Sequence, residues 1–546
     1  MFIKVTKSKN YHYLQLVESY REDGKNKHKV HANLGRFDQL EGNKTLVSLG
    51  QRLLRIAGAA PKPSLEIEER GRLYYGHIVY QKIWEKFKLN GLLASVASSY
   101  RIRYDLGAVI FYLVIHRLLI GGSKHKCYEE QKNFYGLEQH LDLQHIYRSL
   151  DILASHKATL ERQLFDKQRH LFKMKVDVVF YDLTTFHFES NLADDLRNFG
   201  YSKTGHFNEV QVVMGLLVDK EGRPIGYELF EGNMSETKTV IEMLKRLKER
   251  FSIGKVVFVA DRGLNSGYNL KEIKAAGYEY IVGCRIKNQS KKVEGEIFSA
   301  KGYVQGATCE ETGKVLFKYK IIDNHAVNYK DGEGKKQKMT DQLLITWSEK
   351  RRRRDEYKRN RLIDKAKEMI EKGQKISGKK GAKKYLKTMG EQKVKGLDEQ
   401  KIQKDKKWDG YYAIQFSQPE ASAMEIQSAY HTLWRIEESF KVLKSTMKTR
   451  PIFHWTPQRI RGHFMVCFLA FLIERHLEYE LKKNKIDNAS PETIKEALKS
   501  LQLSEIQINN EHYYLKGKHN DLAAKILRIL KIKQPKNLTP MAKRVF

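Results

Sequence analysis

Three acidic residues of this chain have the type and setting that metal-dependent chemistry requires. Asp182 ends the run VDVVFYD and Asp261 ends the run KVVFVAD; both runs are rich in β-branched and aromatic residues, which is typical of strands. Glu437 lies in the stretch 430–448, which contains no proline or glycine. Functional side chains of α/β sheets gather at strand ends, but an Asp there is often only a turn or helix cap. For each aspartate alone, both interpretations stay open.

Three carboxylates suit phosphodiester hydrolysis and strand transfer. These reactions need an activated oxygen nucleophile and a stabilised leaving oxygen, and two divalent ions about 3.5–4 Å apart can provide both. Mg²⁺ prefers carboxylate oxygens and keeps waters or phosphate oxygens as its other ligands. A set of three carboxylates would leave room for those ligands on two Mg²⁺ (or Mn²⁺) ions. The sequence shows no His/Cys cluster for zinc, no G-x-x-x-x-G-K-[ST] loop for a nucleotide and no clear Ser/His/Asp order.

The stretch 430–448 predicts one amphipathic helix. Its apolar stripe consists of Leu433, Ile436, Phe440, Leu443 and Met447, and a flanking stripe consists of Tyr430, Glu437, Lys441, Lys444 and Lys448. Glu437 should therefore point from the edge of the buried face toward the aspartates, whereas Glu438, about 100° further round, should point toward the other side, nearer Arg435. A surface helix with solvated charges would show the same pattern.

The aspartates need a sheet, and residues 176–286 predict one. Strand-like runs occur at 176–190, 209–219, 225–233, 255–261 and 278–286, with one helix at 235–251 and a shorter one after the fourth run. The order β-β-β-α-β-α-β predicts three antiparallel strands followed by crossover connections, which is an α/β sheet.

The flanking regions are basic or helical. Residues 1–40 predict a small basic β-hairpin unit and 44–60 a short helix; 64–170 and 485–546 predict helices. Helices near the N-terminus could bind DNA, although most such helices only pack and no helix-turn-helix signature is evident. The apolar run 107–120 is too short to span a membrane, and we expect a buried helix.

The net charge indicates a polyanionic partner. The 546 residues include 100 Lys+Arg against 65 Asp+Glu, which gives a formal charge of +35. Nucleic acid is the first candidate, since neutralised phosphates release counterions, and an anionic membrane surface is the second. Four scattered cysteines indicate a reducing compartment, and the N-terminus has no signal-peptide core, so we expect a cytoplasmic protein.

The most basic segment is 350–407, with 23 Lys+Arg against 9 Asp+Glu. It belongs to an apparent insertion at about 288–418, whose first half contains the strand-like runs VLFKYKIID and QLLITW. The segment could be a mobile solvated arm. We favour a surface for the DNA backbone, on which Arg351, Arg352, Arg353 and Arg354 are the first candidates.

The motifs YDLTT, VADRG and Y-x2-L-W-R-I-E-x6-K resemble those of the DDE transposases of bacterial insertion sequences, the cut-and-paste group with the YREK signature. LRNFGYSK, GYELFEGNMSE and LWRIEESFKVLKS resemble one branch of that group, and the resemblance covers about 176–475. It implies that the three acids bind two metals and cut DNA. It also implies an RNase H-like mixed sheet flanked by helices, with a β-rich, basic insertion and a mostly helical N-terminal region.

We expect five parts on this basis: a basic β-hairpin unit plus helix (1–60), a helical region (61–172), the catalytic domain (173–287 and 419–480), the insertion (288–418) and a C-terminal helical region (481–546). The implied partners are double-stranded DNA, as transposon ends and target, and a second copy of the chain in a synaptic homodimer; no membrane or nucleotide is expected. The implied location is the bacterial nucleoid. Further expected DNA contacts are Tyr430, Lys441, Lys444, Lys203 and Arg262.

Some positions leave questions open. The signature has an arginine where this chain has Leu433, and Arg435 lies about 160° away around the helix. An aromatic residue of the insertion could hold a flipped base, with Trp347 first and Trp408 second, but either could be a core residue. His463 could contact DNA, although we favour burial. Two rival functions remain, namely a catalytically inactive, transposase-derived DNA-binding protein and a basic nucleic-acid-binding scaffold.

Overall fold

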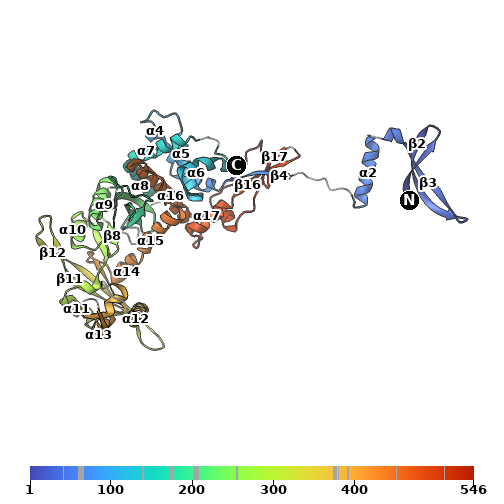
Figure 1. Ribbon diagram of the computed structural model, residues 1–546. Coiled ribbons are helices and arrows are strands. Elements are labelled where there is room, and N and C mark those ends of the chain that lie inside the picture. Colours follow the sequence, from blue (N-terminus) through green and yellow to red (C-terminus); the bar gives the residue numbers. More distant parts are fainter. Residues whose placement is uncertain are drawn as a thin grey trace. The chain divides into compact units, whose positions relative to one another are not determined.

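The structure is a computed structural model that describes residues 1–546 except 41, 60–66, 138–140, 172–173, 175, 201–207, 252, 254–255, 373–377, 379, 390–392, 451 and 510. The chain divides into two compact units (Figure 1). The smaller one comprises Met1–Arg70 with Ile506–Tyr513, and the larger one comprises Gly71–Glu505 with Tyr514–Phe546.

The smaller unit begins with strands. An antiparallel sheet in the order β1-β2-β3 is followed by two helices: β1 (Phe2–Ser8), β2 (Tyr11–Glu22), β3 (Lys25–Arg36), α1 (Phe37–Leu40) and α2 (Lys44–Ile56). Asp23 and Gly24 both have positive φ, which suits the tight turn between β2 and β3. The prediction of a mostly helical N-terminal region is therefore wrong for residues 1–36, because alternating runs such as HYLQLV form strands.

The candidate catalytic region is a mixed sheet, as predicted. Its strands are β5 (Val178–His187), β6 (Gln211–Asp219), β7 (Pro224–Glu231), β8 (Val257–Ala260) and β9 (Glu279–Gly283). They lie in the order β7-β6-β5-β8-β9; β6 is antiparallel to β5 and β7, and β8 is parallel to β5 and β9. Helices α9 (Glu236–Phe251) and α10 (Gly267–Ala275) form the two crossover connections.

The insertion extends this sheet to nine strands. Its strands are β10 (Val304–Thr308), β11 (Val315–Lys330), β12 (Lys336–Ser348) and β15 (Tyr411–Phe416), and β15 pairs antiparallel with β9. The basic half contains α12 (Glu349–Glu371), β13 (Leu386–Met389), β14 (Lys393–Leu397) and α13 (Glu399–Lys406). The arginine run thus lies in a helix that begins directly after a sheet strand.

Helices cover the sheet. Those preceding it are α3 (His77–Lys86), α4 (Leu89–Ala97), α5 (Leu106–Leu119), α6 (Lys124–Glu129), α7 (Leu143–Ser155) and α8 (Lys157–Leu171). The long helix α16 (Pro457–Lys483) and α5 are largely buried in one core with the even-numbered face of β5. Among the described residues no single helix is long and apolar enough to cross a membrane; one bent pair, 106–119 with 124–133, passes by length and composition.

The C-terminal region is not simply helical, which corrects the prediction. It contains α17 (Pro491–Lys499), β16 (Gln502–Ile508), β17 (Glu511–Lys516), α18 (Asp521–Ile529) and β18 (Leu538–Pro540). With β4 (Ile67–Tyr74), the three strands form a sheet in the order β18-β17-β16-β4. In the first of these strands, QLSEIQI, Leu503 and Ile506 are buried.

The stretch 430–448 is divided, although one helix was predicted. Tyr430 lies near the end of α14 (Ala423–His431), Glu437 lies in α15 (Trp434–Lys441), and a π-helical segment (Val442–Thr446) follows α15. At the break, Thr432 Oγ1 donates to the Ser428 carbonyl at 2.9 Å, and Leu433 and Ile436 N–H bond to carbonyls three residues back. Hence the rotation of about 100° per residue, on which the predicted stripes depend, is interrupted within this stretch.

Candidate functional site

Asp182 and Asp261 occupy equivalent positions of adjacent parallel strands. The register pairs Val178 with Val257 and Phe180 with Val259, and each aspartate lies two residues after the second pair. Phe180 and Val259 belong to the same core, so by the alternation of strands both aspartates face that side of the sheet. The fold therefore places the two aspartates at neighbouring positions of the sheet, with Asp182 inside β5 and Asp261 directly after β8.

Local hydrogen bonds orient both carboxylates, which are half-buried. The Leu183 N–H donates to Asp182 Oδ1, and the Gly263 N–H donates to Asp261 Oδ1, each at 2.7 Å. Gly263 also fits closely, because a Cβ there would lie 2.9 Å from Asp261 Oδ1 and 2.9 Å from Glu236 Oε2. Glu236 is thus a neighbour that sequence reasoning missed. Its place in the first turn of α9 suggested only a helix-terminal charge.

The segment that carries Glu437 runs along β5 in the same direction. Near its start, Arg435 Cβ lies 4.0 Å from the Cβ position of Gly222, in the turn after β6; near its end, Lys444 Nζ lies 5.2 Å from the centre of the Phe186 ring. Phe186 lies on the face of β5 that also presents Asp182. Glu437 is therefore on a helix that passes over β5, the strand of Asp182, and its side chain is exposed.

Glu438 has a different environment. Its Oε2 lies 3.7 Å from Arg475 Nη2 on α16, and Arg475 also pairs with Glu478 at 2.6 Å. Glu438 therefore points toward α16. This direction is consistent with the prediction that Glu438 points away from the aspartates. The observed neighbour is Arg475, whereas Arg435 lies against Trp434, 5.1 Å from its ring centre.

The donor set fits a divalent ion in part. Mg²⁺ commonly binds proteins through one or two carboxylates and completes its shell with waters and substrate phosphates, so Asp182 and Asp261 are suitable ligands. Within the described residues, however, no group of three or more His, Cys, Asp or Glu side chains lies close enough to hold a metal ion. This structure therefore does not bring Glu437 into one ligand group with the aspartates.

Two tyrosines lie beside Asp261. The hydroxyls of Tyr430 and Tyr412 are 2.6 Å apart, and both, with the backbone N of Arg262, surround the Cβ position of Gly283. Burial, with the neighbouring phenol and the charge of Asp261, raises the pKa of Tyr430, so its hydroxyl stays protonated. The predicted contact residue Tyr430 is therefore near Asp261. Arg262 is exposed, as is Lys441 at the end of α15.

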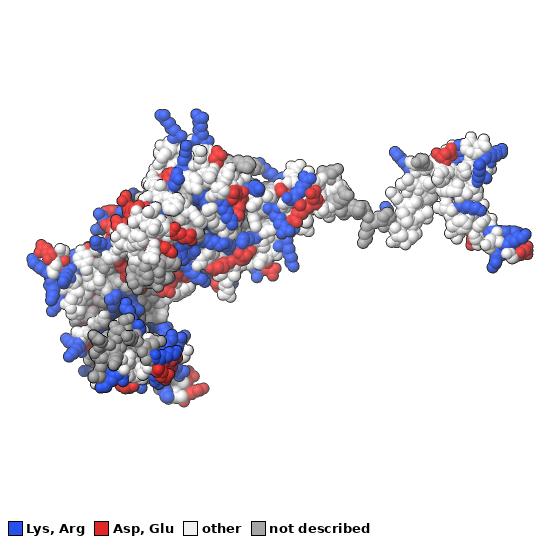
Figure 2. Space-filling view, viewed as in Figure 1, with Lys and Arg blue, Asp and Glu red and all other residues white. Residues whose placement is uncertain are grey.

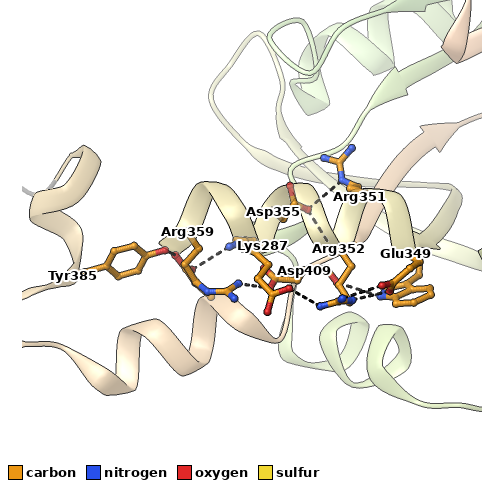
Figure 3. Close-up of polar contacts among 12 residues, drawn as sticks. Lys287, Glu349, Arg351, Arg352, Asp355, Arg359, Tyr385 and Asp409 are labelled. Carbon is orange, nitrogen blue, oxygen red and sulfur yellow. Dashed lines mark hydrogen bonds and ion pairs between the residues drawn. The ribbon is translucent and has the colours of Figure 1, made fainter. Parts of the chain in front are cut away.

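The four arginines of α12 differ in their partners. Arg352 bonds to Glu349 at 2.7 Å and to Glu356 at 2.9 Å, and Arg353 bonds to Glu349 at 2.9 Å. Arg354 is exposed, and Arg351 points away from the Arg352–Glu349 pair (Figure 3). On the face shown in Figure 2, Lys and Arg side chains are interspersed with Asp and Glu. The charge run is therefore partly neutralised within its own helix.

The remaining predicted residues have varied positions. Trp347 is half-buried and its indole N–H donates to the Asp409 carbonyl at 3.1 Å; Trp408 is buried against Phe298, with ring centres 4.8 Å apart. His463 is buried, which confirms the favoured interpretation, and burial lowers its pKa. Lys203 lies outside the described residues.

Comparisons with known proteins identify the family of the chain. The sequence profile of the transposase DDE domain matches residues 174–473, and that of the IS1634 family transposase N-terminal domain matches residues 3–62. No curated protein matches the chain. One similar solved structure is a cryo-EM structure of a piggyBac transposase synaptic complex with hairpin DNA, which is 9% identical over 79% of this chain and 82% of that chain, with a TM-score of 0.36. Because the DDE-domain match spans more than half of the sequence and includes Asp182, Asp261 and Glu437, the chain belongs to the DDE transposases, with an N-terminal domain of the IS1634 family.

Proposed function

We propose that this transposase binds the terminal inverted repeats of its insertion sequence, cleaves the DNA by metal-dependent phosphodiester hydrolysis and transfers the 3′ ends to target DNA. Membership of the family implies DNA cleavage and strand transfer. The observation that carries the detailed proposal is that Asp182 and Asp261 each lie two residues after the paired residues Phe180 and Val259 of adjacent parallel strands. The strand order β7-β6-β5-β8-β9 supports the proposal that this sheet is RNase H-like.

The three acids have distinct roles in this proposal. Asp182 and Asp261 hold the divalent ions, which when bound activate the attacking oxygen and stabilise the leaving one. Glu437 supplies the third carboxylate from α15, above the same face of the sheet. The N–H groups of Leu183 and Gly263 donate to Oδ1 of Asp182 and Asp261, respectively, and so orient the two carboxylates.

The proposed substrate is double-stranded DNA. The formal charge of +35 favours a polyanion; the Tyr430 hydroxyl lies near the backbone of Arg262, the residue after Asp261, and Lys444 lies over Phe186 on β5. Lys441 on α15 and the α12 arginines extend the proposed contact surface, with Lys203 as a further candidate. Two copies are proposed to act together on the two ends, in the bacterial cytoplasm at the nucleoid.

The test uses the DNA that flanks the reading frame. Purified protein is mixed with labelled duplexes copied from both flanks, which should contain inverted repeats, with Mg²⁺, Mn²⁺, Ca²⁺ or a chelator. We expect cleavage with a free 3′ hydroxyl in Mg²⁺ or Mn²⁺, no cleavage with the chelator, and joining of the ends to added plasmid. Binding of the flanking DNA without cleavage in either metal would instead identify an inactive derivative, and equal binding to unrelated RNA would favour a scaffold.

A further inference from the structure

A basic cavity of 410 Å³ adjoins Arg262, the residue after Asp261. The wall includes Arg262 and Cys284, which follow strands of the catalytic sheet, together with β15 and the start of α12 from the insertion. Seven Lys or Arg residues and three Asp residues line it: Arg262, Arg285, Lys287, Arg351, Lys358, Arg359 and Lys384, with Asp355, Asp405 and Asp409. The excess of positive charge suits an anionic ligand.

Several of these cations already have carboxylate partners. Arg359 pairs with Asp409, while Lys287 and Lys384 bond to Asp405 at 3.0 and 2.8 Å (Figure 3 shows the first pair). These pairs build the wall of the cavity and reduce the charge that is available to a ligand.

Arg351 is paired less closely than these cations. Its Nε lies 3.5 Å from Asp355 Oδ2, an oxygen that also accepts the Gly410 N–H at 3.3 Å. Nε is inaccessible to water and has no hydrogen-bond partner among the described residues, although the side chain as a whole is 33% exposed. Within the described part of the chain, Arg351 therefore has only a long ion pair with Asp355, whereas Lys287 and Lys384 bond closely to Asp405.

Tyr412 fixes the guanidinium of Arg351. The group lies 4.4 Å from the centre of the Tyr412 ring, and the Tyr412 hydroxyl bonds to Tyr430 at 2.6 Å. Both hydroxyls lie near the backbone of Arg262. A chain of contacts therefore joins Arg351, from the insertion, to the residue next to Asp261.

This position bears on the arginine that the signature lacks. Leu433 cannot donate a hydrogen bond from its side chain, and Arg435 lies against Trp434 near the turn between β6 and β7. Arg351 nevertheless places a guanidinium in contact with Tyr412, the partner of Tyr430. The positive charge beside the signature tyrosine comes from another part of the chain.

We propose that Arg351 binds one phosphate of the DNA strand that is held at Asp182 and Asp261, with the basic cavity receiving that part of the backbone. The inference rests on the proposed function, since it places the same strand at the aspartates. A planar guanidinium can donate two parallel hydrogen bonds to phosphate oxygens, and stacking on Tyr412 fixes the plane in which they point.

The test is a methylphosphonate scan without divalent cations, so that binding is measured apart from cleavage. Duplexes copied from the flanking DNA carry one uncharged methylphosphonate at successive positions near the end. We expect wild-type binding to fall at a small set of positions. Arg351→Ala should bind the unmodified duplex about tenfold more weakly and should no longer respond to the methylphosphonate at one of them.

Arg361→Ala is the matched control, because Arg361 is an exposed arginine of the same helix, 6.0 Å from the Tyr357 ring and outside the cavity. It should keep the wild-type pattern. Tyr412→Leu, which removes the stacking ring, should weaken the response at the same position as Arg351→Ala. Melting curves check folding, and Arg351→Gln, which keeps the volume without the charge, replaces Arg351→Ala if that variant unfolds.

The inference is overturned if Arg351→Ala, or Arg351→Gln in its place, responds to every methylphosphonate as the wild type does, or if Arg361→Ala loses the same response. Its failure is distinguishable from that of the proposed function. If the protein cleaves DNA with Mg²⁺ or Mn²⁺ but Arg351→Ala keeps the wild-type methylphosphonate response, only the proposed role of Arg351 is rejected. If Arg351→Ala loses the response at one position but the wild type does not cleave DNA in either metal, the phosphate site is supported and the proposed chemistry is rejected.

Discussion

The strand-borne and helix-borne acids of this transposase are held in different ways. Asp182 lies within β5 and Asp261 directly after β8, each two residues beyond the paired residues Phe180 and Val259 of these adjacent parallel strands. Glu437 lies on a short helix between a break at Thr432 and a π-helical segment, and its side chain is exposed. The aspartate pair is therefore formed by the fold alone, whereas the third acid depends on how a divided helix lies on the sheet.

This difference indicates how the site is completed. Strand pairing leaves little freedom to two neighbouring residues, while an exposed glutamate on two turns of helix can change rotamer at small cost. We infer that DNA and metal draw Glu437 toward a preformed aspartate pair. If so, substitutions of the aspartates and of Glu437 should differ in what they remove.

Asp182→Ala should have the largest effect. It removes one of two adjacent metal ligands, and cleavage of the flanking DNA should fall about a thousandfold or more, while DNA binding is retained. The control is Asp177→Asn, an exposed acid just before β5, which should cleave normally. Cleavage that survives in Asp182→Ala would remove Asp182 from the mechanism and with it the idea of a preformed pair.

Glu437→Gln should have the next largest effect. We expect about a hundredfold loss of cleavage and strand transfer, with normal melting, because the side chain is exposed. Glu438→Gln should keep at least part of both activities, since Glu438 faces Arg475 at 3.7 Å. If the two variants exchange these phenotypes, then the orientation of α15 is wrong and the Tyr430 and Lys444 assignments fail with it.

The contrast between strands and helices also explains what the sequence could predict. Runs such as VDVVFYD and KVVFVAD identify strands locally, and the crossover rule then places Asp182 beside Asp261. The break at Thr432 depends on a side chain bonding back to Ser428, which competes with helix continuation in a way that periodicity does not detect. One continuous helix was therefore predicted where two helices and a π-helical segment exist.

Non-local contacts account for the other differences. The insertion joins the main sheet because Ile414 pairs with Gly283, and these residues are far apart in sequence. Glu236 comes near Asp261 only because of the direction in which α9 runs. Its place in the first turn of a helix therefore could not predict that it lies near Asp261. The predicted family, in contrast, followed from short motifs and was confirmed by the DDE-domain match.

Gly263→Ala should have a moderate effect. The new methyl group would lie 2.9 Å from carboxylate oxygens of both Asp261 and Glu236, which must then shift. We expect cleavage to fall about tenfold and the free energy of unfolding to fall by about 1 kcal/mol, as for mild overpacking. Activity in Mg²⁺ and Mn²⁺ and a denaturant melt provide the measurements. Unchanged activity would show that Asp261 tolerates displacement, so that strand pairing alone does not define the site.

The smallest expected effects concern the arginines of α12. Their ion pairs, rather than their residue type alone, should determine which of them contact DNA. Neutralising Arg351, Arg352, Arg353 and Arg354 together should weaken binding to unrelated DNA and make its salt dependence shallower. Taken singly, Arg354→Gln should reduce the slope of log K against log salt by about 0.9, the value for one phosphate contact. Arg352→Gln should reduce it less, because Arg352 already bonds to Glu349 and Glu356.

The comparison between those two variants is informative because both remove one charge from the same helix. A larger loss in Arg354→Gln would show that pairing within α12 determines which arginines reach the DNA backbone. Equal losses would show that the ion pairs open on binding, which is feasible because exposed pairs are weak, on the order of 0–1 kcal/mol. An unchanged slope in the quadruple variant would show that the run is only solvated and that contact with DNA is made elsewhere.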